Sequence, residues 1–552
     1  MSQPRSIAVL GGGITGLTAA YYLRQALPAS VPITIFEATA RVGGYIETSH
    51  VNTNKHNKYD HDDKNVSSTV VFEHGPRTLR VDPKSASSVN MVDLIRRLRL
   101  AGDLIRVRNG TAAQRNRFIY FDRVLNRVPD SVVAVVSSVF TQPLFRSWRI
   151  ASEVAREPFR PPDDSENDES VADFMTRRFG PLVTSRLASA VMHGIYAGDV
   201  NKLSVRSVLE RAWRRDKEAG SLLVKLPWRR RVTGLSASAS DEQAAIDAEN
   251  LRRATAENAE LLARLSDSSV ISFRNGMQSV VDRLRHELNE SSSVRIEYGA
   301  PVQALERVPG GVTVVTRADN GENRQTFTTV FSALPARELS NVVTSARLTE
   351  LLSQIPAVSV NVVNLFYDRT NVLPVTGFGY LVPSAVPVKD ENPERVLGVV
   401  FDSDTVTDEH GVNLQDARKG TKITVMLGGH YWDEAAAVPA VTDEKEAIRQ
   451  ATAAVARHLN RPDLALPTFA QARFHDRCIP QYVVGHAQLL NRIHDAVIDA
   501  YGSGHGLVLL GASFLGVSVP DCVYYSRCAV DRFVSGSHGH GTLTGLEPKI
   551  TQ

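Results

Sequence analysis

Apolar and polar positions recur along this chain with two different periods, which separate the segments that predict strands from those that predict helices. Ile7–Leu10 and Ile33–Phe36 are short, largely apolar runs, as in the strands of a buried parallel sheet. Residues 17–24, between them, suit a helix, and the apolar positions of residues 89–100 recur at helical spacing. The N-terminal pattern therefore predicts a strand–helix–strand unit.

Runs of β-branched residues further along the chain predict a second, larger sheet. They cover residues 358–366, 396–401 and 421–427, while residues 312–316 and 327–331 suit a meander. A helix opened by Gly276, a strand over residues 294–302 and an apolar strand over residues 507–511 return to the first domain. We therefore expect the N-terminal domain to be assembled from three separated pieces.

The turn between the first strand and helix carries glycines at 11, 13 and 16, the G-x-G-x-x-G spacing. In a dinucleotide-binding fold these glycines serve a tight turn, a close approach to pyrophosphate and the packing of helix on strand. Glu37 ends the second strand, 21 residues beyond Gly16, where a carboxylate accepts hydrogen bonds from the ribose hydroxyls. The context predicts a dinucleotide site, because a glycine-rich turn that binds nothing needs no such acid.

The residues after Glu37 distinguish a flavin from a nicotinamide. Arg41, Gly43 and Gly44 follow the acid, and this resembles the FAD-binding signature of the amine-oxidase-like flavoproteins. The resemblance implies that the arginine and the glycine pair add to the pyrophosphate site. We therefore expect FAD as the cofactor.

Several further motifs make the resemblance specific. The sequence F-E-H-G-P-R ends at Arg77, and together with the two glycine motifs it resembles the protoporphyrinogen oxidase family, in its oxygen-dependent mitochondrial branch. The later matching segments are 113–120, 193–199, 375–383, 425–429, 478–482 and 511–522. The resemblance covers almost the whole chain, and it departs from the family in a polar loop over residues 50–68 and a charged segment near 229–267.

This resemblance implies an α/β fold, similar to amine oxidases and p-hydroxybenzoate hydroxylase. It would combine a Rossmann-type FAD-binding domain, an α+β substrate domain and a helical membrane-contacting domain. The implied reaction is a six-electron oxidation of protoporphyrinogen IX to protoporphyrin IX in haem biosynthesis. Dioxygen would be the acceptor, and hydrogen peroxide would be released.

The resemblance also assigns the cofactor site residue by residue. Val302 would offer its backbone to the adenine, while the C-terminal loop would contact the flavin. The expected FAD-binding residues are Gly11, Gly12, Gly13, Ile14, Thr15, Gly16, Glu37, Ala38, Arg41, Gly43, Gly44, Tyr45, Gly75, Pro76, Arg77, Thr78, Val302, Val517, Ser518 and Val519.

A large apolar macrocycle with two propionates requires an apolar slot with a cation at its edge. By resemblance Arg117 would pair with a propionate, Phe378 and Leu381 would sandwich the macrocycle, and Met426 would line the slot. Gly194 would bring a backbone carbonyl to the carbon that loses hydride, so Gly194 and Arg117 are the expected catalytic residues. The neighbouring His193 is interpreted as a structural histidine.

The resulting domain prediction has seven parts. The FAD-binding domain would comprise residues 1–85, 268–335 and 475–540. A helical membrane-associated domain would cover residues 86–215, a solvent-exposed charged helical insertion 216–267, the substrate-binding sheet domain 336–474, and a flexible tail 541–552.

Composition mainly excludes classes of partner and of binding site. With 63 basic and 60 acidic residues the formal net charge is only +3, so no nucleic-acid partner is implied. The three cysteines form no disulfide framework and no metal-binding spacing, and no metal site is expected. The few residues before the first strand leave no room for a secretory or transit peptide.

Membrane contact is expected to be peripheral, since no run of about 20 apolar residues could span a bilayer. Pro129 and Pro143 enclose 13 mainly apolar and small residues, which suit either an interfacial contact or an ordinary core helix. Arg146 and Arg149, just beyond them, would suit lipid headgroups. The resemblance implies the intermembrane-space face of the mitochondrial inner membrane, a homodimer and product transfer to ferrochelatase.

Two alternatives remain open from the sequence. The first is an FAD-dependent amine or polyamine oxidase on the same fold, although residues 513–518 show no amine-oxidase signature. The second is a carrier without chemistry, like the Rab-regulating dissociation inhibitors, which share the dinucleotide scaffold. Glu37 and Arg41 favour a bound FAD over the carrier.

Overall fold

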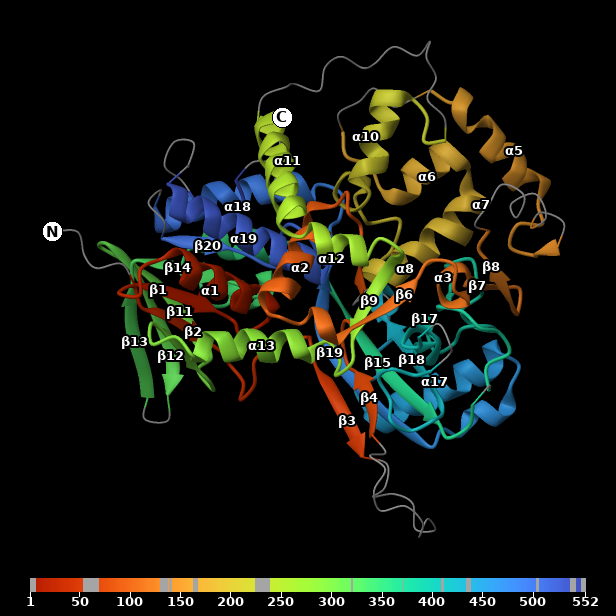
Figure 1. Ribbon diagram of the computed structural model, residues 1–552. Helices are drawn as coiled ribbons and strands as arrows, with labels where there is room; N and C mark the ends of the chain where they lie inside the picture. Colours follow the sequence, from red (N-terminus) through yellow and green to blue (C-terminus); the bar gives the residue numbers. More distant parts are fainter. Residues whose placement is uncertain are drawn as a thin grey trace, which may run out of the picture.

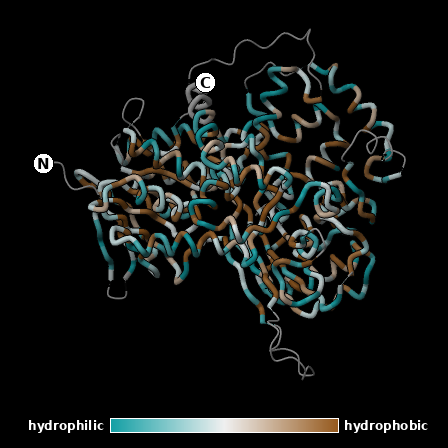
Figure 2. The backbone as a smooth tube through the Cα atoms, in the orientation of Figure 1, coloured by the Kyte–Doolittle hydropathy of each residue, from teal (hydrophilic) through white to brown (hydrophobic). Residues whose placement is uncertain are grey.

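The computed structural model describes residues 6–52, 69–129, 138, 141–161, 167–223, 239–318, 321–370, 372–408, 412–432, 438–502, 506–536 and 543–547. Most of the polar loop, most of the segment between Pro129 and Pro143, and the basic run at residues 229–231 lie outside the described residues. Hydrophobic segments concentrate in the interior and hydrophilic ones at the periphery (Figure 2).

A five-stranded parallel sheet organises the N-terminal part of the structure (Figure 1). Its strands, in spatial order, are β10 (Val294–Glu297), β2 (Ile33–Phe36), β1 (Ile7–Leu10), β14 (Thr329–Ser332) and β20 (Leu507–Leu509). All four pairings are parallel. The strands come from three distant stretches of sequence, and the predicted α/β fold is confirmed.

Both faces of this sheet are covered, which explains why its strands are apolar on both sides. One face packs on α1 (Ile14–Ala26), α13 (Gln278–Asn289) and α19 (Val519–Ser535). The other packs on α14 (Ala336–Ser340), α15 (Ala346–Ser353), α18 (His486–Tyr501) and the meander β11 (Val302–Val308), β12 (Gly311–Ala318) and β13 (Gly321–Phe327).

A seven-stranded sheet forms the second large layer. Its order is β19 (Phe469–Pro480), β15 (Ala357–Tyr367), β18 (Thr421–Gly428), β17 (Val396–Val400), β16 (Gly379–Leu381), β7 (Arg117–Phe121) and β8 (Val124–Arg127). Helix α17 (Glu444–His458) packs on one face, and α8 (Ser189–Tyr196) lies against β16 and β17 on the other.

The chain is divided differently from the predicted domain boundaries at two points in this sheet. Strands β7 and β8 belong to it, although the sequence predicts their residues in the helical domain. Strand β19 stays paired with β15 as far as Pro480, beyond the predicted boundary at residue 474. Both differences arise from pairing across distant segments, which local sequence patterns do not reveal.

Two small sheets connect the large ones: β3 (Thr48–Asn52) with β4 (Thr69–Glu73), and β5 (Leu79–Arg80) with β9 (Ser268–Phe273) and β6 (Leu104–Arg108). The helical part contains α5 (Trp148–Arg156), α6 (Val171–Phe179), α7 (Pro181–Val183), α9 (Val205–Val208) and α10 (Glu210–Ala219) beside α8. In the described chain, no helix combines the length and apolar character needed to span a membrane.

The predicted exposed insertion is partly wrong, because its second half is packed. Helix α11 (Ala239–Glu257) lies beside α2 (Ala86–Arg97), with α12 (Ala259–Arg264) following. The side chains of Ala254 and Leu265 are fully buried, and the Asn258 amide donates to Asp93 of α2 at 3.1 Å. The apolar face is short, which is why the sequence pattern missed it.

The C-terminal tail also differs from prediction over its described part. Leu543, Thr544 and Leu546 are buried, and the backbone N–H of Leu509 donates to the carbonyl of Thr544 at 2.7 Å. Residues 543–547 therefore extend the packing around strand β20 instead of forming a flexible tail.

Candidate active site

The glycine turn between β1 and α1 has the geometry of a dinucleotide site. Gly11 has a φ of 92°, and a Cβ added at Gly16 would lie 2.0 Å from the Gly11 carbonyl oxygen, so both positions require glycine for the turn itself. Gly13 differs, because the only atom within reach of an added Cβ is the Gly44 Cα at 3.9 Å. Packing within the described chain does not explain glycine at position 13, whereas a closely bound phosphate does.

The N-terminus of α1 is open in the same region. Gly13 is its N-cap residue, with no side-chain hydrogen bond to the first turn and no acidic residue in that turn. The first N–H groups of a helix attract anions when nothing caps them. The turn and the helix end therefore suit a pyrophosphate.

Glu37 lies at the end of the adjacent strand, as the sequence predicted, and its side chain is buried. Its Oε2 accepts the Gly12 N–H at 2.9 Å, and its Oε1 accepts the Thr39 N–H at 2.9 Å. The Thr39 hydroxyl also donates to Oε1 at 2.8 Å, so the carboxylate is held in a fixed position and one acceptor position on Oε2 remains for a ribose hydroxyl. The N–H of Ala300 donates to the Glu37 carbonyl at 2.9 Å, which brings the start of β11 and Val302 to this edge.

The second glycine motif lies directly against the first. Gly43 and Gly13 form an isolated parallel bridge, and the Gly43 N–H donates to the Gly12 carbonyl at 2.8 Å. Arg41 donates through Nη2 to the Gly44 carbonyl at 2.6 Å, so this guanidinium stabilises the glycine loop. Segments 11–16 and 37–45, which are separate in sequence, therefore form one continuous lining of the candidate dinucleotide site.

Two more predicted segments reach the same lining. A Cβ at Gly75 would lie 1.9 Å from the Tyr45 carbonyl oxygen, so these loops cross with no space between their backbones. Ser518 caps α19, and within that helix Ser526 donates to the Thr15 carbonyl of α1 at 3.2 Å. The structure thus joins the glycine turn to the Gly75 loop and to the C-terminal helix, and together they fit FAD.

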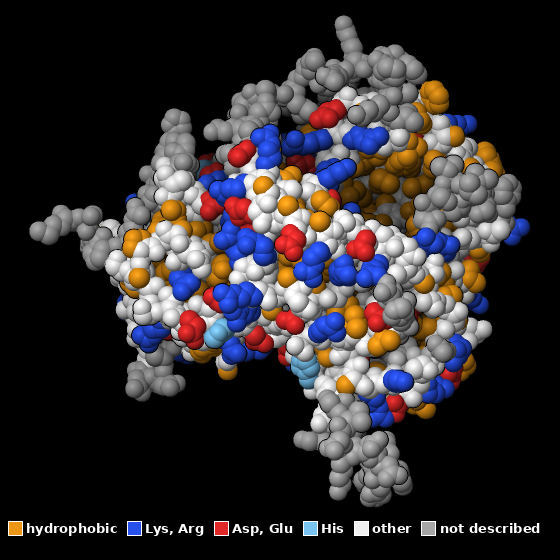
Figure 3. All heavy atoms as spheres, viewed as in Figure 1, with side chains coloured by type: hydrophobic (Ala, Val, Ile, Leu, Met, Phe, Trp, Pro, Cys, Tyr) orange, Lys and Arg blue, Asp and Glu red, His pale blue; other side chains and the backbone are white. Residues whose placement is uncertain are grey.

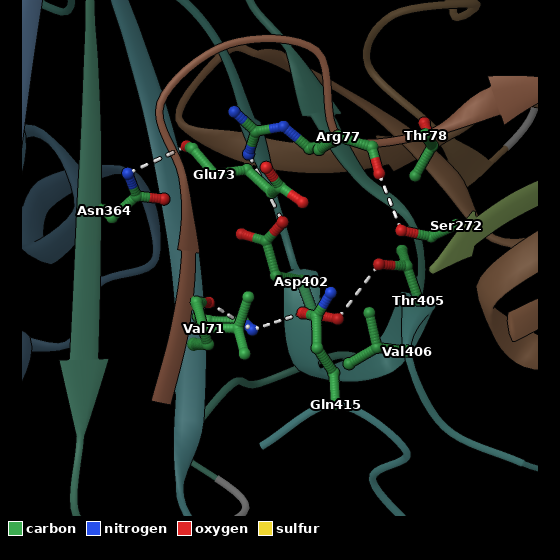
Figure 4. Close-up of a pocket in the computed structure, with 11 residues that line it drawn as sticks. Val71, Glu73, Arg77, Thr78, Ser272, Asn364, Asp402, Thr405, Val406 and Gln415 are labelled. Atoms are coloured by element: carbon green, nitrogen blue, oxygen red, sulfur yellow. Dashed lines mark hydrogen bonds and ion pairs between the residues drawn. The ribbon is translucent and has the colours of Figure 1, made fainter. Parts of the chain in front are cut away.

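The side chain of Arg77 forms an ion pair that the sequence did not predict. Its Nη1 lies 3.3 Å from Asp402 Oδ1, and both side chains are about nine-tenths buried. Figure 4 shows the pair in a small pocket of about 10 Å³ between the Gly75 loop and the seven-stranded sheet. The guanidinium ties the loop to the sheet, and a flavin contact by Arg77 stays a prediction.

Glu73 is a second polar group in this cavity that sequence reasoning missed. Its Oε1 accepts the Met277 N–H at 2.7 Å and its Oε2 accepts the Thr48 hydroxyl at 2.8 Å. Burial nevertheless raises the pKa of Glu73 to about 7. Only its place at the end of a buried strand could have drawn attention to it, since its partners are distant in sequence.

Replacing Glu73 by Gln should change how stability depends on pH. A carboxyl whose pKa rises on folding, here from 4.5 to about 7, loses stability as pH rises between those values. The unfolding free energy of Glu73→Gln relative to wild type should therefore increase by about 1.4 kcal/mol per pH unit from pH 4.5 to 7 and then level off. Urea unfolding at several pH values measures this, and parallel profiles for the two proteins would contradict it.

Three of the predicted substrate residues gather where α8 crosses the seven-stranded sheet, whereas Phe378 packs beside β6 and β9. A Cβ at Gly194 would lie 2.8 Å from Leu381 Cδ2, and a Cβ at Gly398 would meet the same atom at 2.8 Å. Met426 pairs with Gly398 in the next strand. Gly194, Leu381 and Met426 therefore form one apolar edge at the contact between α8 and the sheet. Helix α8 also exposes the apolar side chains of Val191 and Ile195 there.

Arg117 begins strand β7 beside this group. Its guanidinium carbon lies 5.8 Å from the centroid of the Phe378 ring, and its side chain is exposed. Gly379 pairs with Arg117 and Leu381 with Ile119, so the arginine lies two residues along the strands from the apolar edge. An apolar edge with one nearby cation has the chemistry expected for a carboxylate-bearing apolar substrate.

Hydrophobic side chains also gather in a hollow over the helical part, around α6 and α7 (Figure 3). Basic side chains occupy much of the adjoining surface in the same view. The hollow places further apolar surface on the helical side of the molecule, where α8 also lies.

Comparisons with known proteins match nearly the whole chain. The description "Flavin containing amine oxidoreductase" fits residues 14–532. A protoporphyrinogen oxidase of Schizosaccharomyces pombe is 33% identical over 535 residues, covering 96% of this chain and 99% of that protein. A protoporphyrinogen oxidase of Homo sapiens is 32% identical over 531 residues, covering 95% and 97%.

Among solved structures, a putative protoporphyrinogen oxidase from Exiguobacterium sp. 255-15 superposes with a TM-score of 0.69 at 22% identity. The match covers 97% of this chain and 100% of that chain. At this identity the likeness shows the fold.

Proposed function

The chain belongs to the flavin-containing amine oxidoreductases and, within them, to the protoporphyrinogen oxidase family, and on this premise we propose that it oxidises protoporphyrinogen IX to protoporphyrin IX in haem biosynthesis. The observation that carries the proposal is the 33% identity to a protoporphyrinogen oxidase across 96% of this chain and 99% of the relative. FAD is the cofactor, in keeping with the family and with the lining built from segments 11–16 and 37–45.

The residues of the chain bind and orient, while FAD, when bound, accepts the electrons. The open N-terminus of α1 and the glycines hold the pyrophosphate, and Glu37 holds the ribose. Leu381 and Met426 orient the macrocycle, and Arg117 binds a propionate at its edge. Three two-electron cycles remove six electrons in total, with dioxygen as the final acceptor and hydrogen peroxide as the second product.

A direct assay tests the proposal against the amine oxidase alternative. Purified protein is given protoporphyrinogen IX in one arm and polyamines in the other, and hydrogen peroxide release is measured in both. We expect release with the tetrapyrrole alone. Release with polyamines and none with protoporphyrinogen would overturn the proposal, and a colourless protein without flavin absorbance would favour the carrier.

Gly194 offers a local test of the slot. In Gly194→Ala the added methyl would lie 2.8 Å from Leu381 Cδ2, which must shift. Since Leu381 is a flexible side chain, the fold should survive, while KM for protoporphyrinogen rises several-fold with normal FAD content. Leu381→Ala in the same protein should restore part of the loss. Equal KM values for wild type and Gly194→Ala would show that this contact does not border the substrate.

Peripheral membrane contact at the intermembrane-space face of the mitochondrial inner membrane belongs to the same proposal. It is supported by Trp148 and Phe159, whose residues are 74% and 76% exposed beside the basic residues Arg146 and Arg149. Trp148→Ser with Phe159→Ser should reduce co-sedimentation with anionic vesicles, and unchanged binding would contradict this surface. A homodimer and transfer of the product to ferrochelatase complete the proposal.

A further inference from the structure

A pair of histidines lies directly behind the proposed slot. His193 Nδ1 is 2.7 Å from the Val382 carbonyl oxygen, and its Nε2 is 2.8 Å from His430 Nε2. The two rings lie side by side with centroids 4.8 Å apart, and His193 is buried. These contacts join three separate elements: α8, the residue after β16, and the turn that follows β18.

The hydrogen-bond partners determine where the protons of this pair lie. A carbonyl oxygen only accepts, so His193 carries its proton on Nδ1 and donates it to Val382. Burial lowers the pKa of His193 to about 4, so the ring is neutral near pH 7 and its Nε2 accepts. His430 must therefore be the donor, with its proton on Nε2.

The same bond lies next to a close contact between α8 and β16. His193 is the neighbour of Gly194, and Val382 is the neighbour of Leu381. A Cβ at residue 194 would lie 2.8 Å from Leu381 Cδ2, so helix α8 and the Leu381 side chain are in direct contact at this point. The distance between His193 Nδ1 and the Val382 oxygen consequently sets how closely Gly194 and Leu381 approach.

We propose that His193 is a positioning residue, which clamps α8 to the end of β16 through the Val382 carbonyl while His430 holds its ring in the required tautomer. The inference rests on the proposed function, since it concerns the slot for the tetrapyrrole. His193 contacts no reacting atom in this account. It acts through Gly194 and Leu381, whose spacing places the macrocycle.

Two conservative substitutions separate the two contacts of the ring. In His193→Asn the amide nitrogen takes the position of Nδ1 and can still donate to Val382, whereas in His193→Gln the amide lies at the level of Nε2 and keeps only the His430 contact. We expect His193→Leu and His193→Gln to lower kcat/KM for protoporphyrinogen by roughly 10- to 100-fold. His193→Asn should recover most of the activity, and FAD content should be normal in all three.

A matched control removes a buried histidine elsewhere. His494 Nδ1 bonds the Thr544 hydroxyl at 2.6 Å in α18, away from the slot. His494→Leu should lower the thermal unfolding temperature without changing KM or kcat. Equal activity losses in His193→Asn and His193→Gln, or full activity in His193→Leu, would overturn the clamp.

A measurement without turnover keeps the clamp distinct from the proposed function. In wild-type protein with ¹⁵N-labelled histidine, the His193 signal, assigned by its loss in His193→Asn, should show a protonated Nδ1 and an unprotonated Nε2. His430→Phe should shift that signal. A proton on His193 Nε2 would overturn the clamp even in an active enzyme, whereas the expected signal in a protein that leaves protoporphyrinogen unchanged would refute only the proposed function.

Discussion

Gly13→Ala is expected to leave the fold intact and to remove FAD from the purified protein. The added methyl finds only the Gly44 Cα, at 3.9 Å, and the φ of Gly13 is −72°, which alanine adopts without strain. The same methyl occupies the space where the pyrophosphate must approach. Losing two charge-assisted hydrogen bonds, at about 1.5–3 kcal/mol each, would weaken FAD binding by roughly 100-fold or more.

The flavin-to-protein absorbance ratio and the thermal unfolding temperature of the apoprotein together measure this effect. Gly16→Ala is the matched control, because its methyl would lie 2.0 Å from the Gly11 carbonyl oxygen and must disrupt the turn itself. We expect Gly13→Ala to match wild-type apoprotein in stability and Gly16→Ala to be strongly destabilised. A normal flavin ratio in Gly13→Ala would mean that the phosphate site lies elsewhere.

Arg117→Ala should weaken substrate binding by about ten- to a hundredfold, because a guanidinium–carboxylate contact contributes roughly 1.5–3 kcal/mol. In the described chain this guanidinium forms no ion pair, and its aromatic contact is Phe378 at 5.8 Å, so it is available for a substrate carboxylate. If the contact also orients the macrocycle, kcat should fall as KM rises. FAD content should be unchanged, since Arg117 lies in the other sheet.

Two controls define the chemistry at Arg117. Arg117→Lys should restore only part of the activity, because a point charge lacks the bidentate geometry of a guanidinium. With a tetrapyrrole whose propionates are esterified, wild type and Arg117→Ala should behave nearly alike. An equal loss on ester and free acid would show that Arg117 is not the propionate anchor.

The sequence sufficed for the parts of the site that depend on local geometry. The glycines at 11, 13 and 16 and the acid at 37 lie within one strand–helix–strand unit, where spacing alone predicts relative position. The parallel sheet followed from apolar runs that are buried on both faces. Family resemblance then added the substrate residues, which carry no such local signal.

The remaining features depend on contacts between distant segments. Arg77 and Asp402 are 325 positions apart, and no periodicity links them before the chain folds. His193 was interpreted as a structural histidine, but its partners Val382 and His430 come from other elements of the fold. Likewise β7 joins the large sheet by pairing with β16, more than two hundred residues later.

Oxidation of the tetrapyrrole is measured by the fluorescence of protoporphyrin after protoporphyrinogen IX is added to the purified, flavin-containing protein. Gly13→Ala protein serves as the blank, since it corrects for spontaneous oxidation by air. We expect porphyrin fluorescence that rises well above the blank, with about three hydrogen peroxide molecules released per porphyrin formed. A protein with a full flavin spectrum whose fluorescence follows the blank would contradict this expectation.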